Sequence, residues 1–408
     1  MLDPHYLQQI ADGAENIAAQ LHEYIIRQII DRMMIRIGRG ESYLLTSSDR
    51  WRIEVLQDSG YLLEDITAEL AKYTKRQEKE IKAAMEEAGV KALEYDDKIY
   101  QAAGLSPMPL TQSPALIRLM ERNYNATLAE WRNYTRSTAQ AAQRLFLNEC
   151  DLAYNKVMSG AVSYSQAVRE AVEAAVSVGV YVDYPTGHRD TIETATARAV
   201  RTGIAQAAGD VSIKRMEEMD WDIILVSAHI GARTGDGGQN PGNHLWWQGQ
   251  FYSRTGRDKR FPDFYEHTGY GTGEGLCGWN CRHSFGSGDG ENNPYKDILN
   301  SDNYRMETLE KRQRLLERRV RKTKREVMGL QEAVEKCQDE AAKAELQQTL
   351  DRKSYLLSRQ NKAYSDFCKQ NDLRPLNERL QIAKWSREQA AKARGAARRY
   401  QNTKGGQT

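Results

Sequence analysis

Half of the glycines in this chain of 408 residues are concentrated in one segment. Fifteen of the 30 glycines lie between Gly231 and Gly290, and glycine is unfavourable inside long helices because its backbone loses the most freedom there. We therefore predict loops and short strands for this segment, held together by side chains. The wider segment from about Trp221 to Tyr295 contains four of the seven histidines and four of the seven tryptophans, which are His229, His244, His267, His283, Trp221, Trp246, Trp247 and Trp279.

The sequence on either side of this segment is typical of amphipathic helices. Ile10, Ile17, Leu21, Ile25 and Ile29 recur at spacings that place them on one helix face. The fold class we predict is mainly α with a small α+β, Gly-rich central domain and a C-terminal helical hairpin or coiled coil. The predicted segments are an N-terminal helical region (1–215), a Gly/His/Trp-rich α+β module (216–300), a helical hairpin or coiled coil (301–373), and a basic C-terminal helix and tail (374–408).

Local signals predict the ends of several elements. Gly38-Arg39-Gly40 should end the first long helix, and Ser59-Gly60 should close a short helix that Ser48 begins. A separate helix is then expected over residues 62–87. Ser113-Pro114 predicts a helix start, another helix is expected over about 191–219, and the run "WDIILVS" predicts a strand.

The C-terminal third contains two runs of heptad-like apolar spacing. Leu309, Leu316 and Val320 belong to the first run, and Leu346 and Leu350 belong to the second. This pattern predicts an antiparallel hairpin that turns near residues 337–345. Because "CQDEAAKAE" contains no glycine or proline, one unbroken helix is the alternative.

Composition limits the compartment and the partners. The longest apolar runs are about half of the roughly 20 residues that a membrane-spanning helix needs. The N-terminus lacks the basic start and apolar middle of a signal peptide. Five cysteines, an odd number, predict a reducing compartment such as a cytoplasm rather than a disulfide framework. The net charge of +2 means that any affinity for nucleic acid must come from a local cluster.

The run "CGWNCRH" predicts a metal site. Cys277, Cys281 and His283 are the ligand types that zinc prefers, and a structural zinc could hold a glycine-rich segment together. His229, His244 and His267 compete for the fourth position. The alternative is that both cysteines are small buried residues and that the histidine has hydrogen-bond partners in the core.

A catalytic site is a second hypothesis for the same segment. His229, Arg233 and His244 follow a predicted strand end, and Glu274 could complete a polar pocket with them. Such a site would fit a metal-dependent nuclease or a transferase. However, the sequence contains no G-x-S-x-G element and no P-loop, and buried histidine, arginine and tryptophan can instead satisfy loop carbonyls. We therefore expect a structural role rather than an enzyme.

Two basic clusters are candidates for contact with nucleic acid. Residues 311–325 contain nine basic side chains and one acid, and residues 379–404 contain eight basic side chains and one acid. The alternatives are an acidic protein partner, or a solvated helix face whose partner is the acidic part of the same hairpin. The candidate contact residues are Arg318, Arg319, Arg321, Lys322, Arg398 and Arg399.

The central segment resembles a known family. "VSAHIGAR", "HLWWQGQFY", "GYGTGEGLCGWNCRHSFGSG" and "NPY" are similar to the signature of the phage minor capsid protein 2 family, and the opening "MLDPHYLQQI" also fits. That family is related to the Mu F-like head-morphogenesis proteins through an Asn-Cys-Arg element, here residues 280–282. The resemblance assigns motif positions to His229, Ala232, Arg233, His244, Trp247, Gln248, Gly249, Tyr252, Gly275, Asn280, Cys281, Arg282 and His283.

The resemblance implies a structural component of the virion of a tailed phage or prophage. Such a protein would act near the portal vertex in head assembly and in DNA packaging or delivery. Its expected partners are portal and capsid proteins and packaged DNA, with no membrane, and it would be made in the cytoplasm of a bacterial host. No settled catalytic role comes with the resemblance.

Overall fold

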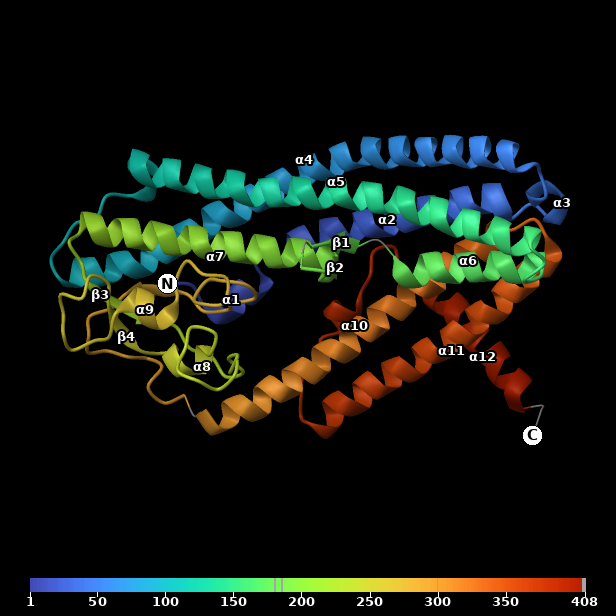
Figure 1. The fold of residues 1–408 in the computed structure, drawn as a ribbon. Coiled ribbons are helices and arrows are strands. Elements are labelled where there is room, and N and C mark those ends of the chain that lie inside the picture. Colours follow the sequence, from blue (N-terminus) through green and yellow to red (C-terminus); the bar gives the residue numbers. More distant parts are fainter. Residues whose placement is uncertain (180, 185, 299, 406–408) are drawn as a thin grey trace. The chain divides into compact units, whose positions relative to one another are not determined.

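The protein is mainly helical with two small sheets, which confirms the predicted fold class. The computed structural model describes residues 1–179, 181–184, 186–298 and 300–405 (Figure 1). None of the helices in these described ranges is long and apolar enough to cross a membrane. The helices of ten residues or more are α2 (Asp12–Ile37), α4 (Ser48–Ala102), α5 (Pro114–Met158), α6 (Tyr164–Val178), α7 (Ile192–Glu218), α10 (Asn300–Lys336), α11 (Glu340–Gln370) and α12 (Arg387–Gly405).

The chain forms two compact units, each assembled from three separate stretches. Unit 1 comprises Met1–Glu15, Thr74–Asn133 and Thr194–Lys311, and unit 2 comprises Asn16–Tyr73, Tyr134–Glu193 and Arg312–Thr408. The four consecutive segments predicted from composition therefore describe runs of secondary structure rather than these units. Local composition carries no information about which distant helices pack together.

Helix α4 differs from the prediction, because one helix replaces the two that were expected. Gly60 lies inside α4, and the Ser59 hydroxyl donates to the backbone oxygen of Leu56 at 2.8 Å without ending the helix. A glycine inside a helix costs about 1 kcal/mol. Burial of the same helix face, including Trp51 and Leu62, outweighs that cost.

Helices α10 and α11 form the predicted hairpin in unit 2, and the alternative of one unbroken helix is wrong. The break falls at residues 337–339, where the Asp339 side chain caps α11 by accepting from the Ala342 amide at 2.9 Å. The antiparallel pairing is fixed by Lys353, which bonds Glu326 at 2.9 Å, and by Gln313, which donates to Tyr364. Coiled-coil packing along the pair stays a prediction.

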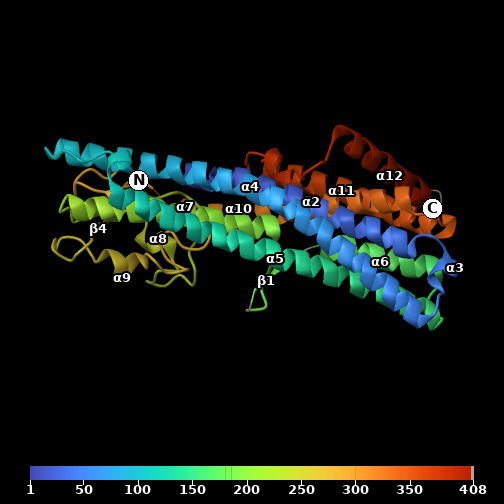
Figure 2. The same ribbon diagram turned by 90° about the horizontal axis from the view of Figure 1, so that it is seen from above.

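Helix α12 lies beside α11 within unit 2 (Figure 2). The guanidinium of Arg399 donates to both carboxylate oxygens of Asp351, at 2.7 and 3.0 Å. Tyr355 and Tyr400 also pack ring to ring, with centroids 5.3 Å apart. The predicted basic C-terminal helix is thus present, and part of its charge is paired inside the unit.

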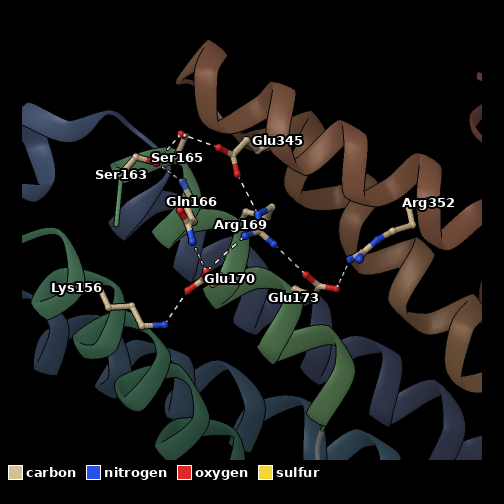
Figure 3. A network of polar contacts seen from close by, with 9 residues as sticks. All are labelled: Lys156, Ser163, Ser165, Gln166, Arg169, Glu170, Glu173, Glu345 and Arg352. Atoms are coloured by element: carbon tan, nitrogen blue, oxygen red, sulfur yellow. Dashed lines mark hydrogen bonds and ion pairs between the residues drawn. The ribbon is translucent and has the colours of Figure 1, made fainter. Parts of the chain in front are cut away.

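Helix α6 presents one apolar face and one charged face. Its buried residues repeat every three or four positions, from Tyr164 to Val176. On the other face, Arg169 donates to Glu345 of α11 at 3.0 Å, and Arg352 donates to Glu173 at 2.7 Å (Figure 3). Because these side chains are partly exposed, each pair contributes only about 0–1 kcal/mol.

A short hairpin in unit 2 has no counterpart in the predictions. Strands β1 (Tyr181–Asp183) and β2 (Arg189–Thr191) pair antiparallel, with Val182 opposite Asp190. Three-residue strands are too short to give a periodic signal, so the sequence pattern did not reveal them.

Unit 1 contains a three-stranded antiparallel sheet in the order β4-β3-β5. The central strand β3 (Ile223–Val226) is the predicted strand, and β4 (Phe251–Ser253) and β5 (Phe285–Ser287) flank it. Two short helices, α8 (His244–Trp247) and α9 (Phe264–Thr268), lie in the loops around it (Figure 1). The glycine-rich segment thus has the loops and short strands that its composition predicts.

The sheet of unit 1 is anchored to α4 and to the start of the chain. The Asp96 carboxylate accepts from the Ser287 amide at 2.8 Å, and the Ser287 hydroxyl donates to Tyr100 at 2.6 Å. The Leu2 amide donates to the Ser284 hydroxyl at 3.0 Å, just ahead of helix α1 (Pro4–Gln9). All these groups are buried, so the position of β5 is fixed by satisfied hydrogen bonds.

Candidate functional site

The centre of the glycine-rich segment is a buried cluster of imidazole, thiol and indole side chains in unit 1. His283 is 1% exposed, His244 is 2% exposed and Trp247 is fully buried. The ring of His283 stacks on His229 at a centroid distance of 4.4 Å and meets the rings of His244 and Trp247 edge-on at 5.2 and 4.9 Å. Residues up to 54 positions apart in the sequence thus form one packed group.

Gln248 fixes the orientation of His283. Its side-chain oxygen lies 2.9 Å from Nε2 of His283 and also accepts from the His229 amide at 3.1 Å. An amide oxygen only accepts, so Nε2 of His283 must carry the proton, and Nδ1 keeps its lone pair. Nδ1 faces the sulfur of Cys281 at 3.6 Å.

Cys281 lies in a turn that is shaped for close approach of its sulfur to the backbone. Its Sγ accepts from the His283 amide at 3.3 Å. Cys277 and Asn280 both have a positive φ, of 59° and 57°, which is uncommon for residues other than glycine. A Cβ atom at Gly275 would lie 2.3 Å from the backbone oxygen of Gly269, so only glycine fits there. The sequence "GLCGWNCRH" thus forms a tight structure around the thiol.

The imidazole of His244 also contacts two residues outside the cluster, Glu274 and Arg233. Its Nε2 lies 2.9 Å from the backbone oxygen of Glu274 and 2.5 Å from the guanidinium of Arg233. Arg233 also donates to that oxygen of Glu274 at 2.7 Å. Burial, followed by the nearby positive charge of Arg233, lowers the pKa of His244 to about 3.

Burial has the same effect on the other members of the cluster. It lowers the pKa of His283 well below its ordinary value, and it raises the pKa of the Cys277 and Cys281 thiols. His244 and His283 are therefore neutral imidazoles near pH 7. Neutral imidazole is the form that ligates metals.

Three of these residues could hold one metal ion. Ligand atoms of His244, Cys281 and His283 all lie within 4.8 Å of one another. Cys277, which the sequence placed in the metal set, is buried beside them but is not a member of this group. His267 bonds the backbone oxygen of Asp263 at 3.1 Å instead. Among the predicted candidates for the remaining ligand, His244 is thus the one that the structure brings to Cys281 and His283.

The first turns of α10 bind the loop that carries His229 and Arg233. The Asn303 side chain accepts from the amides of Gly231 and Ala232 at 2.8 and 2.7 Å and donates to the Ala232 oxygen at 2.8 Å. Glu307 accepts from Thr234 at 2.8 Å. Sequence reasoning missed both helix residues, because a polar residue on a charged helix gives no signal of its distant partner.

Arg282 connects three parts of the same unit. It donates to the backbone oxygen of Gly231 and to the carboxylate of Glu310, both at 3.0 Å, and to the Gln8 side chain at 3.3 Å. A guanidinium suits this task because it offers five donors in a rigid plane. The Asn-Cys-Arg element therefore contributes a bent backbone, a buried thiol and a cross-link.

The structure shows where the predicted catalytic residues lie relative to a nearby pocket. Glu274 offers His244 its backbone oxygen, and its side chain is exposed. A surface pocket of about 370 Å³ lies nearby, lined by residues that include Trp246, Gln248 and Tyr295. In the part of the chain that the structure describes, its lining includes none of the four predicted catalytic residues, which are His229, Arg233, His244 and Glu274.

Comparison with protein families identifies the chain. Residues 2–357 match the family described as phage minor capsid protein 2. The chain belongs to this family. Membership makes it a structural phage protein and implies a component of the virion. No curated protein and no solved structure matches the chain.

In this member of the phage minor capsid protein 2 family, most motif residues bond backbone groups or pack closely against neighbouring residues. Trp247 donates to the Pro241 oxygen at 3.0 Å, and the Tyr252 hydroxyl donates to the Trp247 oxygen at 2.7 Å. Gly249 has a φ of 66°, and a Cβ there would lie 3.1 Å from the side chain of Ala228. The buried members, Ala232 among them, are thus explained by packing and hydrogen bonds.

The predicted basic contact residues all belong to unit 2, but they differ in exposure and in whether their charge is paired. Arg318, Arg319 and Lys322 are exposed on α10 and form no ion pair within the described ranges. Arg321 donates to the backbone oxygen of Arg379 at 2.7 Å. Of the two in the C-terminal helix, Arg398 is exposed, and Arg399 is paired with Asp351, as described above.

Proposed function

We propose that this chain is a minor component of the phage head that acts near the portal vertex, in head assembly and in DNA packaging or delivery. Family membership is the observation that carries the proposal. Its partners would be portal and capsid proteins and the packaged DNA, and it would be made in the cytoplasm of the bacterial host. Mass spectrometry of purified particles tests the role. The chain should be present at a fixed, low ratio to the portal protein, and its absence from particles would refute the proposal.

An exposed apolar row in unit 2 supports docking on another protein. Ile53 and Leu56 of α4 are 60% and 53% exposed, and their spacing of three residues places them on one helix face. Contiguous exposed apolar side chains often mark protein interfaces. The acceptor would be the portal or capsid protein of the same phage.

Co-purification with the phage's own portal and capsid proteins tests this docking surface. Ile53→Asp combined with Leu56→Asp should abolish co-purification while helix content stays unchanged, because both positions are exposed. Val90→Asp on the same helix, where the side chain is 41% exposed, is the matched control and should bind normally. Equal binding by all three proteins would refute the assignment of this row.

The exposed cations of α10 support contact with DNA. Arg318, Arg319 and Lys322 have no carboxylate partner among the described residues, so their charge is available to phosphates. Binding to mixed-sequence duplex DNA should weaken steeply with salt. Replacing all three with glutamine should reduce the slope of log K against log salt by about 2.7, at roughly 0.9 per phosphate contact.

The control for this experiment removes the same amount of charge elsewhere. Arg50, Lys72 and Lys82 of α4 are each at least 65% exposed, and their replacement by glutamine should leave the slope almost unchanged. Fluorescence anisotropy of labelled DNA measures both variants. Salt-insensitive binding, or a slope that falls equally in both variants, would contradict a DNA contact on α10.

The metal-dependent nuclease or transferase is not our preferred reading. The four candidate catalytic residues are absent from the lining of the nearby pocket within the described ranges. A nuclease assay on the purified chain tests the enzyme alternative. Cleavage that His244→Gln abolishes without unfolding would favour the enzyme and refute our preference.

A further inference from the structure

We propose that His244, Cys281 and His283 bind a structural zinc ion inside unit 1. The inference does not depend on the role near the portal. It depends on three ligand atoms that lie within 4.8 Å of one another in a buried part of a loop-rich fold. Imidazole nitrogen and thiolate sulfur are the ligands that zinc prefers.

The best-defined edge of the site has the length that zinc requires. Zinc–nitrogen and zinc–sulfur bonds of about 2.0 and 2.3 Å at a tetrahedral angle place the two ligand atoms roughly 3.5 Å apart. Nδ1 of His283 and Sγ of Cys281 are 3.6 Å apart. Two residues separated by one position thus present a preformed pair, and His244 approaches it from the loop after β3.

Outer contacts prepare the ligands. Gln248 accepts the Nε2 proton of His283, which leaves Nδ1 as the nitrogen with a lone pair on the side of the sulfur. The His283 amide donates to Sγ of Cys281 at 3.3 Å, a contact that stabilises negative charge on sulfur. The backbone oxygen of Glu274 accepts from Nε2 of His244 at 2.9 Å, which leaves the lone pair on Nδ1. Metal-binding histidines commonly have such partners on their other ring nitrogen.

The place of the site in the chain gives the ion a structural task. His244 and Cys281 are separated by 36 intervening residues, which include seven glycines and, apart from the rest of α8, one short helix, α9. An ion that joins the two ends removes chain entropy from the unfolded state, and metal-binding energy at such a site is folding energy.

Metal analysis of the full-length chain tests the proposal. Protein produced in zinc-supplemented medium and dialysed should retain one zinc per chain by mass spectrometry. Cys281→Ser and His283→Gln should each reduce the bound zinc to background. Cys277→Ser and His267→Gln are matched controls from the same segment and should retain it. Loss of zinc in Cys277→Ser to the same extent as in Cys281→Ser would overturn the ligand assignment.

A second measurement covers variants that fail to fold. Cobalt added to chelator-treated wild type should give the visible bands of a tetrahedral site and a sulfur-to-cobalt charge-transfer band. Chelation should lower the melting temperature, and added zinc should restore it. Wild-type protein that carries no metal after zinc supplementation, shows no cobalt bands and melts unchanged with chelator would refute the proposal. In that case, the Cys281 thiol simply donates to Nδ1 of His283.

Discussion

Replacing Arg325 with methionine should severely destabilise unit 2, because it leaves two buried carboxylates without a counter-charge. The guanidinium donates to Glu23 at 2.9 Å and also bonds Glu193, which in turn accepts from His22 at 2.8 Å. The arginine side chain is 9% exposed, and the two glutamates are 2% and 4% exposed. These residues come from α2, α7 and α10, so the network joins three helices of the unit.

The expected magnitude follows from the burial of both charges. Removing one partner of a buried ion pair costs about 3–5 kcal/mol, whereas replacing the whole network with neutral groups is often close to neutral. Arg325→Met should therefore cost 3–5 kcal/mol. The triple variant that adds Glu23→Gln and Glu193→Gln should recover most of this loss, because no uncompensated charge remains. Arg352→Gln removes a 52% exposed arginine from its pair with Glu173 and should cost at most about 1 kcal/mol.

Hydrogen exchange measured by mass spectrometry reports on unit 2 separately. For amides of α2 and α6 that exchange through unfolding of the unit, a loss of 3–5 kcal/mol accelerates exchange roughly 100- to 4,000-fold. Peptides over residues 16–37 and 164–178 should show this in Arg325→Met and only a small change in Arg352→Gln. If Arg325→Met and Arg352→Gln exchange at the same rate, or if the triple variant is worse than the single one, the reasoning is refuted.

Three further predictions concern unit 1. Burial raises the pKa of Asp222, but hydrogen bonds from Ser253 and Thr255 outweigh it and hold the pKa at about 2, below the unfolded value of about 3.9. Its stabilisation, at most about 2.6 kcal/mol, is present above pH 4 and lost as the pH falls towards 2, so Asp222→Asn should melt with a weaker acid dependence than wild type. Gly275→Ala should cost about 1–3 kcal/mol, because the new Cβ meets two backbone oxygens, and an unchanged melting temperature would contradict the close approach. Asn303→Ala should cost about 1–3 kcal/mol for each amide left unpaired and accelerate exchange around residue 231, and unchanged exchange there would show that the bonds contribute nothing.

The helical part of the fold could be predicted where a local signal coincides with a helix end. Ser113-Pro114 begins α5, and the hairpin breaks within the predicted window. The prediction failed at Gly60, because burial of one face of α4 outweighs the cost of an interior glycine. The packing of helices that are distant in the sequence could not be predicted either. The two units interleave three stretches each, and no local pattern encodes that.

The candidate site was predictable in composition but not in geometry. Clustering of glycine with histidine and tryptophan correctly indicated loops held by side chains, and Cys281 and His283 are indeed adjacent. The sequence could not distinguish Cys277 from His244 as a member of the group, because spacing gives no direction for a side chain. Nor could it reveal Asn303, whose partners lie 71 and 72 residues away.

The contacts of the cluster also explain how residue types that are common in catalytic sites can stabilise a loop-rich structure. A loop without a sheet partner leaves its carbonyl and amide groups to be satisfied by side chains. Arg233 and Arg282 each bond a backbone oxygen, Trp247 bonds another, and Gln248 accepts from the amide of His229. A helix would need none of these donors. The polar residues concentrate here because the glycines do, and the removal of Arg282 or Trp247 would leave the backbone oxygen of Gly231 or Pro241 without the bond that this side chain donates.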